Sequence, residues 1–393
     1  MLNYKNPIRQ TKKTEELIVV DDLAPVREIV QFMLRNNRYT NIRSLETAKL
    51  ALSVLGSRRI ALVITDWNMP NMTGIEFLIQ IKSDPKLFHI PVIMISDERS
   101  NDKVLYAVEE GVDGFLVKPF SEHDLMKSVE LALARRDPKN EIERKIFEMK
   151  GMKLAGNYRE ALELGFEILK VRNHPRVILM TCECLYHVEE YDKAIAMMAD
   201  TEGDNRSSQH ANLQGKIYMK LGQHAQGLRA LEQSVKLNPL SHGRKIDLAG
   251  AYFTTGKIKE AERVITTIAD RDLTDLSLVN IADLYLEQGD LEKAGAYLKR
   301  TVNPIPETVP VFNNYAVALR RVNRFEEAAE IYRKCLSINP DSDVLHYNLG
   351  LLYTKIDKCQ EAREALSNAL RLNPENQYAK ALLQNIPADR KTP

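Results

Sequence analysis

The first third of the chain alternates short apolar runs with longer amphipathic stretches. The apolar runs are rich in valine and isoleucine and fall at residues 17–20, 60–65, 92–95 and 115–117, with a weaker run at 39–43. Runs of this length are typical of strands that are buried on both faces of a sheet. Helical periodicity separates them, at residues 25–35, 47–55, 74–82, 103–110 and 122–135. This alternation predicts an α/β fold with a doubly wound, five-stranded parallel sheet.

The pattern changes at Asp137-Pro138-Lys139-Asn140, which interrupts the last helical stretch. Beyond it the sequence has no strand-like run, and helical patterns follow one another, each closed by a glycine, asparagine or proline turn. We therefore expect a polar N-terminal tail (1–13), an α/β domain (14–137), a linker (138–140), an all-helical region (141–375), and a final helix with a C-terminal tail (376–393).

The helical region repeats with a fixed period of 33 or 34 residues. The turn between paired helices ends in a small residue at Ala161, Ala194, Gly227, Ala261, Ala294, Ala328 and Ala362. A second series in the same register comprises Gly215, Ala249, Ala282, Ala316 and Gly350. This pattern resembles the tetratricopeptide repeat (TPR), in seven copies over residues 141–375, with residues 376–386 as a capping helix. The resemblance implies an all-α solenoid whose concave surface binds a partner.

Asparagine recurs on the helices that we expect to line this concave surface. Asn280, Asn314 and Asn348 are spaced by 34 residues, two positions before the small residue of each repeat. An amide side chain can donate to and accept from a peptide backbone at once, so a row of asparagines could hold an extended chain. The alternative is that these residues are simply polar side chains on solvated helix faces.

Polar residues stand at the carboxyl ends of the predicted strands. Asp21 and Asp22 follow the first strand, Asp66 follows the third, and Ser96 and Lys118 end the fourth and fifth. With the strand order 2-1-3-4-5, the first and third strands are neighbours at the switch point, where such sheets bind ligands. Three close carboxylates require a cation, and Mg²⁺ suits oxygen ligands. Because a carboxylate can act as a nucleophile beside a lysine, these residues predict phosphoryl transfer onto an aspartate.

The same segment resembles the CheY-like receiver domain of two-component response regulators over about residues 14–137. The matching motifs are the acidic pair in Val19-Val-Asp-Asp22, the phosphoacceptor loop Asp66-Trp-Asn-Met-Pro-Asn-Met-Thr-Gly74, and the Lys-Pro motif Lys118-Pro119-Phe120. A haloacid-dehalogenase phosphatase would instead require an Asp-x-Asp pair after the first strand, and the sequence lacks that pair.

The resemblance implies a role for each site residue. Asp66 would be the phosphoacceptor, Ser96 and Lys118 would contact the phosphoryl group, and Phe115 would be an aromatic switch. The Lys118–Pro119 peptide bond is expected to be cis.

The resemblance also implies a Mg²⁺ site. Asp22, Asp66 and the backbone carbonyl of Asn68 would bind the metal directly, while Asp21 would hold a metal-bound water. Asn68 and Glu98 occupy positions that influence dephosphorylation in the family. Asp97 is a departure, because a small residue is usual there, and an acid could hinder access to Asp66.

Composition narrows the classes of partner. The 393 residues contain 55 Lys and Arg against 54 Asp and Glu, a net charge of +1, which argues against direct nucleic-acid binding. No apolar run approaches the ~20 residues of a membrane helix, and the N-terminus has no stretch like that of a signal peptide. The four cysteines form no C-x-x-C pair, which favours free thiols in a reducing cytoplasm.

We therefore expect a cytoplasmic, non-enzymatic response regulator of a phosphorelay. A histidine kinase or histidine phosphotransfer protein would phosphorylate Asp66, and the TPR array would bind a protein or peptide or form a homodimer. Two alternatives stay open: a phosphate sink or inhibitor that holds a kinase and competes with another regulator, and a phosphorylation-independent scaffold.

Overall fold

The computed structural model describes residues 15–97, 100–136, 141–199, 207–268, 273–301 and 305–386. The expected tail at 1–13, the linker at 138–140, Glu98 and residues 387–393 lie outside these ranges. The chain divides into two compact units, Met1–Ala251 and Tyr252–Pro393, and this division falls inside the repeat region. The α/β domain shares its unit with the first repeats because their side chains pack on it, as Leu240 does on its core.

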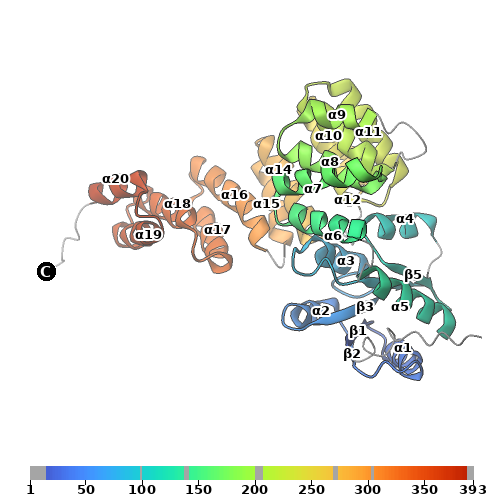
Figure 1. The fold of residues 1–393 in the computed structure, drawn as a ribbon. Coiled ribbons are helices and arrows are strands. Elements are labelled where there is room, and N and C mark those ends of the chain that lie inside the picture. Colours follow the sequence, from blue (N-terminus) through green and yellow to red (C-terminus); the bar gives the residue numbers. More distant parts are fainter. Residues whose placement is uncertain are drawn as a thin grey trace, which may run out of the picture. The chain divides into compact units, whose positions relative to one another are not determined.

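A five-stranded parallel sheet lies at the centre of the α/β domain (Figure 1). Its order is β2-β1-β3-β4-β5, as predicted. Every residue of β1, β3 and β4 is buried, as expected for strands that are covered on both faces. The strands are β1 (Glu16–Val20), β2 (Ile42–Leu45), β3 (Ile60–Asp66), β4 (Val92–Ser96) and β5 (Gly114–Val117).

Helices cover both faces of the sheet. Ile18 belongs to one hydrophobic cluster and Leu17 to the other, because successive strand residues point to opposite faces. Helices α2, α3 and α4 contribute to the first cluster, and α1 and α5 to the second. The helices are α1 (Ala24–Asn36), α2 (Ala48–Leu55), α3 (Gly74–Ser83), α4 (Asn101–Glu109) and α5 (Glu122–Arg136). The predicted doubly wound fold is confirmed.

The second strand differs from its predicted position at residues 39–43. Helix α1 ends at Asn36, and Arg38 then adopts a left-handed backbone with a φ of 68°. Tyr39 donates its backbone N–H to Leu34 O and lies buried beside the helix end. The aromatic residue thus packs as part of a loop, and β2 begins only at Ile42.

Seven helical pairs and a final helix occupy the described part of the repeat region. The first unit contains α6 (Glu141–Leu154), α7 (Tyr158–Val171), α8 (Pro175–His187), α9 (Tyr191–Ala199), α10 (Ser208–Lys220) and α11 (His224–Leu237). Helix α12 (His242–Thr254) spans the division between the units. The second unit continues with α13 (Ile258–Thr266), α14 (Asp275–Glu287), α15 (Leu291–Arg300), α16 (Val309–Arg321), α17 (Phe325–Ile338), α18 (Asp343–Lys355), α19 (Cys359–Leu372) and α20 (Gln377–Asn385).

The turn within each pair explains the repeating sequence phrase. Its first residue has a left-handed backbone, which suits glycine best and tolerates asparagine and aspartate. Its last residue is buried where the two helices of a pair cross, so only a small side chain fits. The left-handed residues and their φ angles are Gly156 (80°), Glu189 (64°), Gly222 (73°), Gly256 (74°), Gly289 (76°), Asn323 (63°) and Asp357 (58°).

Helix α20 covers the last repeat. Its Ala379 is fully buried in a cluster with Leu366 and Ala369 of α19, and Ile386 closes the same cluster. A terminal repeat would otherwise expose the face that its neighbours bury. Among the described residues, no helix combines the length and the apolar character that crossing a membrane requires.

Candidate functional site

Four of the residues predicted for the acidic site meet at the carboxyl edge of the sheet. In the sheet register, Val20 pairs with Thr65, Asp66 with Ile95 and Ser96 with Val117. Asp21 and Lys118 directly follow β1 and β5, so they lie at the same edge as Asp66 and Ser96. Asp21, Asp66 and Ser96 are all buried.

Lys118 is the central partner in this acidic site. Its Nζ lies 2.7 Å from Asp66 Oδ1, 3.5 Å from Asp21 Oδ2 and 3.8 Å from Asp97 Oδ1. Asp97 is the departure noted in the sequence, and its exposed carboxylate draws on the same ammonium. The Lys118–Pro119 peptide bond is cis.

Burial and neighbouring acidic charge oppose the ionisation of Asp21 and of Asp66. Burial is the largest cause that raises the pKa of Asp66, and hydrogen bonding to Lys118 only partly offsets it. Burial likewise raises the pKa of Asp21, and the neighbouring charge of Asp66 adds to the effect. Burial is the largest single effect on Lys118 and works against its ammonium, but the hydrogen bond to Asp66 and the charges of Asp66, Asp21 and Asp97 together raise its pKa. The site therefore holds more negative charge than one lysine can neutralise comfortably.

The loop after β3 is fitted closely around Asp66. The backbone N–H of Asn68 donates to Asp66 Oδ2 at 2.6 Å, and that of Gly74 donates to Trp67 O at 2.9 Å. A Cβ on Gly74 would lie only 2.0 Å from Asp66 O, so any side chain there would displace the loop. Thr73 and Glu76 form a capping box that starts α3 at this point.

An aromatic pair lies next to the site. The rings of Trp67 and Phe115 are in edge contact, with centroids 6.2 Å apart. Phe115 is half-buried and packs on the same cluster as Trp67. Lys103 of α4 places its Nζ 5.3 Å from the centroid of the Trp67 ring. The predicted switch residue thus contacts the neighbour of Asp66, and α4 contacts that neighbour too.

The residues are compatible with a hard divalent cation. Asp21 Oδ2 is buried and accepts no hydrogen bond, which leaves an oxygen for a ligand. The predicted ligand Asp22 is exposed, and within the described ranges no three acidic, histidine or cysteine side chains form a ready-made metal cluster. Mg²⁺ typically takes one or two carboxylates and keeps several waters, so Asp22 and Asp66, with Asp21 beside them, are compatible with a partial ligand set.

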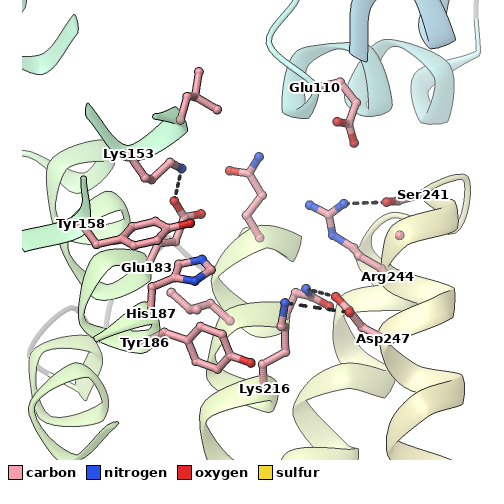
Figure 2. A pocket seen from close by; sticks show the side chains of 15 residues that line it. Glu110, Lys153, Tyr158, Glu183, Tyr186, His187, Lys216, Ser241, Arg244 and Asp247 are labelled. Atoms are coloured by element: carbon pink, nitrogen blue, oxygen red, sulfur yellow. Dashed lines mark hydrogen bonds and ion pairs between the residues drawn. The ribbon is translucent and has the colours of Figure 1, made fainter. Parts of the chain in front are cut away.

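A hollow in the first unit is lined by the first repeats and by the end of α4 (Figure 2). It has a volume of about 490 Å³, and Glu110 at the end of α4 points toward Arg244 across it. The rings of Tyr158 and His187 stack on its wall, 4.1 Å apart. Two ion pairs complete the lining: Lys153 with Glu183, and Lys216 with Asp247. The mixture of rings, amides and paired charges suits a polypeptide ligand better than a small apolar one.

The predicted asparagine row is only partly regular. Asn280 and Asn314 are exposed, whereas Asn348 donates through Nδ2 to Asn313 Oδ1 at 2.9 Å. A pair with the same spacing occurs in the first unit, where Asn212 donates through Nδ2 to Asp247 Oδ2 at 2.7 Å. Sequence reasoning missed Asn212 and Asn313, which lie 35 residues from their partners and outside the 34-residue spacing of the predicted row.

Comparison with known proteins agrees with this geometry. Residues 17–130 match the response regulator receiver domain family. Tetratricopeptide repeat families match residues 212–272, 246–310 and 319–386, and the family of anaphase-promoting complex (cyclosome) subunit 3 matches residues 155–234.

Individual relatives match the first domain over nearly their whole length. The chemotaxis protein CheY of Pseudomonas aeruginosa is 36% identical over 120 residues, which are 30% of this chain and 97% of the relative. CheY-3 of Vibrio cholerae is 35% identical over 123 residues, 31% of this chain and 95% of the relative. The solved structure of CheY4 of Vibrio cholerae is 29% identical, with a TM-score of 0.28, and the match covers 30% of this chain and 97% of that one. The chain therefore belongs to the response regulator receiver family, and tetratricopeptide repeats follow its receiver domain.

Proposed function

We propose that Asp66 accepts a phosphoryl group from a histidine kinase or histidine phosphotransfer protein, and that the TPR array delivers the output by binding another protein. The observation that carries this proposal is the position of Lys118 Nζ, 2.7 Å from Asp66 Oδ1, in a buried site that also contains Asp21. A buried carboxylate with a fixed cation beside it is arranged to receive a group that carries negative charge.

The reaction assigns a role to each residue. A carboxylate oxygen of Asp66 attacks the phosphorus, an O–P bond forms, and the N–P bond of the donor breaks with its electron pair returning to the imidazole. Lys118 pairs with the phosphoryl oxygens, and Ser96 can donate its hydroxyl proton to them. The backbone N–H of Asn68 already donates to Asp66 Oδ2 and fixes the orientation of the carboxylate. Bound Mg²⁺, which Asp22, Asp66 and the backbone carbonyl of Asn68 would hold directly and Asp21 through a water, would supply the positive charge that offsets the incoming phosphoryl oxygens.

The repeats offer no chemistry of their own, so we assign them to partner binding, and we limit the chemistry of the chain to phosphorylation and dephosphorylation of Asp66. Asn280 and Asn314 are exposed and suit a peptide backbone. We place the protein in the cytoplasm, which the buried free thiols of Cys182, Cys184 and Cys335 support.

Trp67 provides the test, because it is the single tryptophan of the chain and adjoins Asp66. Beryllofluoride, which mimics a bound phosphoryl group, should change its fluorescence in the presence of Mg²⁺. An Asp66→Asn chain should not respond to beryllofluoride. A folded parent protein that responds to neither Mg²⁺ nor beryllofluoride would refute the proposed phosphoacceptor role.

A second measurement, of partner binding and of phosphoryl flux to another regulator, distinguishes the regulated array from a phosphate sink and from a scaffold. If an Asp66→Asn chain changes partner binding, the array follows the phosphorylation state. If it changes only the flux of phosphoryl groups to another regulator, the chain is a phosphate sink. If it changes neither, the chain is a scaffold.

A further inference from the structure

Helix α4 ends in a buried polar contact with the repeats. Glu109 Oε2 lies 2.9 Å from Arg244 of α12, and the side chains of both residues are 8% exposed. Ser208 donates its hydroxyl to the same carboxylate at 2.6 and 2.8 Å, and Asn238 donates its Nδ2. Gln209 Nε2 donates to the backbone oxygen of Glu109 at 2.8 Å. Residues from α10, from the turn after α11 and from α12 therefore converge on one carboxylate of the receiver domain.

The repeats build this carboxylate subsite from buried groups. Ser208 is 2% exposed, Asn238 is fully buried and Arg244 is 7% exposed. Arg244 Nε and Asn238 Oδ1 are also buried and have no hydrogen-bond partner. An arginine that loses its carboxylate partner in such a place leaves an unpaired buried charge, which is strongly unfavourable. The subsite therefore needs an acidic group, from α4 or from another chain.

The subsite opens onto the hollow in Figure 2, which Arg244 and Gln209 help to line. Lys153 and Lys216 pair with acids of the repeats themselves, Glu183 and Asp247, whereas Arg244 pairs with Glu109 of the receiver domain. A ligand that entered the hollow would therefore find its charged anchor at Arg244. The stacked ring of Tyr158 can pack against the rest of an extended segment.

Helix α4 connects this subsite with the phosphoacceptor. Lys103 near its start lies over the ring of Trp67, and Tyr106 and Ala107 are buried in the cluster that contains Trp67. Glu109 is at its other end, about 9 Å along the helix axis from Lys103 at 1.5 Å per residue. The helix is short and well packed, so a shift at its start also moves its end. The five polar contacts of Glu109 have a fixed geometry, and such a shift can only weaken them.

We propose that Arg244, Asn238 and Ser208 form a subsite of the partner-binding surface that binds an acidic side chain. Glu109 of the same chain occupies this subsite. The partner is an extended protein segment, and one of its acidic side chains replaces Glu109 when phosphorylation shifts α4. This inference rests on the proposed function for its trigger. The existence of the subsite does not depend on Asp66, so the two claims can fail separately.

The subsite is tested with a peptide of known sequence. A fluorescein-labelled peptide of residues 101–112, titrated into the full-length Glu109→Gln chain, should bind at least about tenfold more tightly than the same peptide with Gln in place of Glu109. The parent chain should bind it more weakly than the variant, because its own Glu109 competes. Asp102→Asn, at the exposed start of the same helix, is the matched control and should behave like the parent. Equal binding of both peptides, or binding of neither, would overturn the subsite. If Glu109→Gln unfolds the protein, Ser208→Ala, which removes only the two hydrogen bonds of the Ser208 hydroxyl to Glu109, serves in its place.

The trigger is tested by hydrogen exchange in the full-length protein. Beryllofluoride with Mg²⁺ should speed amide exchange in residues 207–212 and 238–247 of the parent but not of the Asp66→Asn chain. The Glu109→Gln chain should exchange fast in both conditions. If Trp67 fluorescence responds to beryllofluoride while these segments do not, the proposed function stands and the release of α4 is wrong. If Trp67 does not respond, the proposed function fails, and the peptide titration alone decides the subsite.

Discussion

Lys118 Nζ lies 2.7 Å from Asp66 Oδ1, although the two residues are 52 positions apart and follow different strands. The parallel sheet brings them together because all its carboxyl ends meet at one edge. The same lysine is within 4 Å of Asp21 and Asp97, so one ammonium serves three acids. This shortage of positive charge governs the behaviour expected of the site.

Removing the ammonium should slow phosphorylation. Lys118→Met is expected to lower the rate of Asp66 phosphorylation by about a hundredfold, because a positioned donor is lost where negative charge develops. Time courses with acetyl phosphate, resolved on phosphate-affinity gels, measure the rate. Lys49→Met removes an exposed lysine of α2 and should leave it unchanged. Equal rates for Lys118→Met and the parent would show that the lysine has no part in the transfer.

The raised pKa of Asp21 predicts a pH-dependent gain in stability on neutralising it. A carboxylate whose folded pKa is raised destabilises the fold when charged, and this penalty disappears as pH falls through the raised pKa toward 3.8. Asp21→Asn should therefore raise the thermal midpoint followed by Trp67 fluorescence at pH 7, with a gain that shrinks on acidification.

Bound Mg²⁺ would offset the charge of the buried Asp21 carboxylate. It should therefore raise the thermal midpoint of the parent more than that of the Asp21→Asn chain. A gain in stability that stayed constant between pH 7 and pH 4, or an equal response to Mg²⁺, would contradict the account of Asp21.

Gly74 should tolerate no side chain. The Cβ of Gly74→Ala would lie 2.0 Å from Asp66 O, so we expect a loss of about 1–3 kcal/mol of stability together with impaired phosphorylation. Gly243→Ala is the matched control, because its Cβ meets nothing within 4 Å and alanine favours the helix by up to about 1 kcal/mol. Denaturant unfolding measures the stability of the Gly74→Ala and Gly243→Ala chains. A stable Gly74→Ala chain with normal phosphorylation would mean that the loop is not constrained as described.

Glu110 should make the first unit sensitive to pH. Burial and its neighbour Glu109 raise its pKa to about 7, against the opposing charge of Arg244. The charged form of Glu110 therefore lowers the stability of the fold above about pH 7, and this loss fades as the pH falls toward 4.5. Glu110→Gln should therefore stabilise the protein by about 2 kcal/mol at pH 8 and by much less at pH 5.

The thermal unfolding midpoints of the Glu110→Gln chain and the parent, compared between pH 5 and pH 8, test this prediction. The other ionisable groups that line the hollow are Lys153, Tyr158, Glu183, Tyr186, His187, Lys216, Arg244 and Asp247. Burial lowers the pKa of His187, so its protonation below pH 6.5 destabilises the fold. This contribution is common to both chains and cancels in their difference. A difference that did not change with pH would show that Glu110 is not buried beside Arg244.

Much of the fold was accessible from local pattern. The buried strands were continuous apolar runs, and β2 was misplaced because the apolar Tyr39 packs as a loop residue. The repeat could be recognised from the sequence because two of its positions are restricted. The left-handed turn position accepts few residue types, and the position where the helices cross accepts only small side chains. The acidic site followed from sheet topology, which fixes where strand ends meet.

The contact between α4 and the repeats was not accessible in this way. Glu109 and Asn238 are 129 positions apart, and in the sequence both read as ordinary surface residues of helical segments. The contact of Asn348 with Asn313 was missed for a related reason, because Asn313 lies outside the 34-residue spacing of the predicted asparagine row. Tertiary packing, and not sequence period, decides such contacts.

The central claim is that Asp66 is the phosphoacceptor. Phosphorylating the protein with acetyl phosphate and Mg²⁺, reducing the acyl phosphate with borohydride and locating the resulting homoserine by mass spectrometry tests it directly. The account predicts homoserine at position 66 alone, and none in the Asp66→Asn chain. Homoserine at Asp21, Asp22 or Asp97, or no conversion in a folded parent protein, would contradict it.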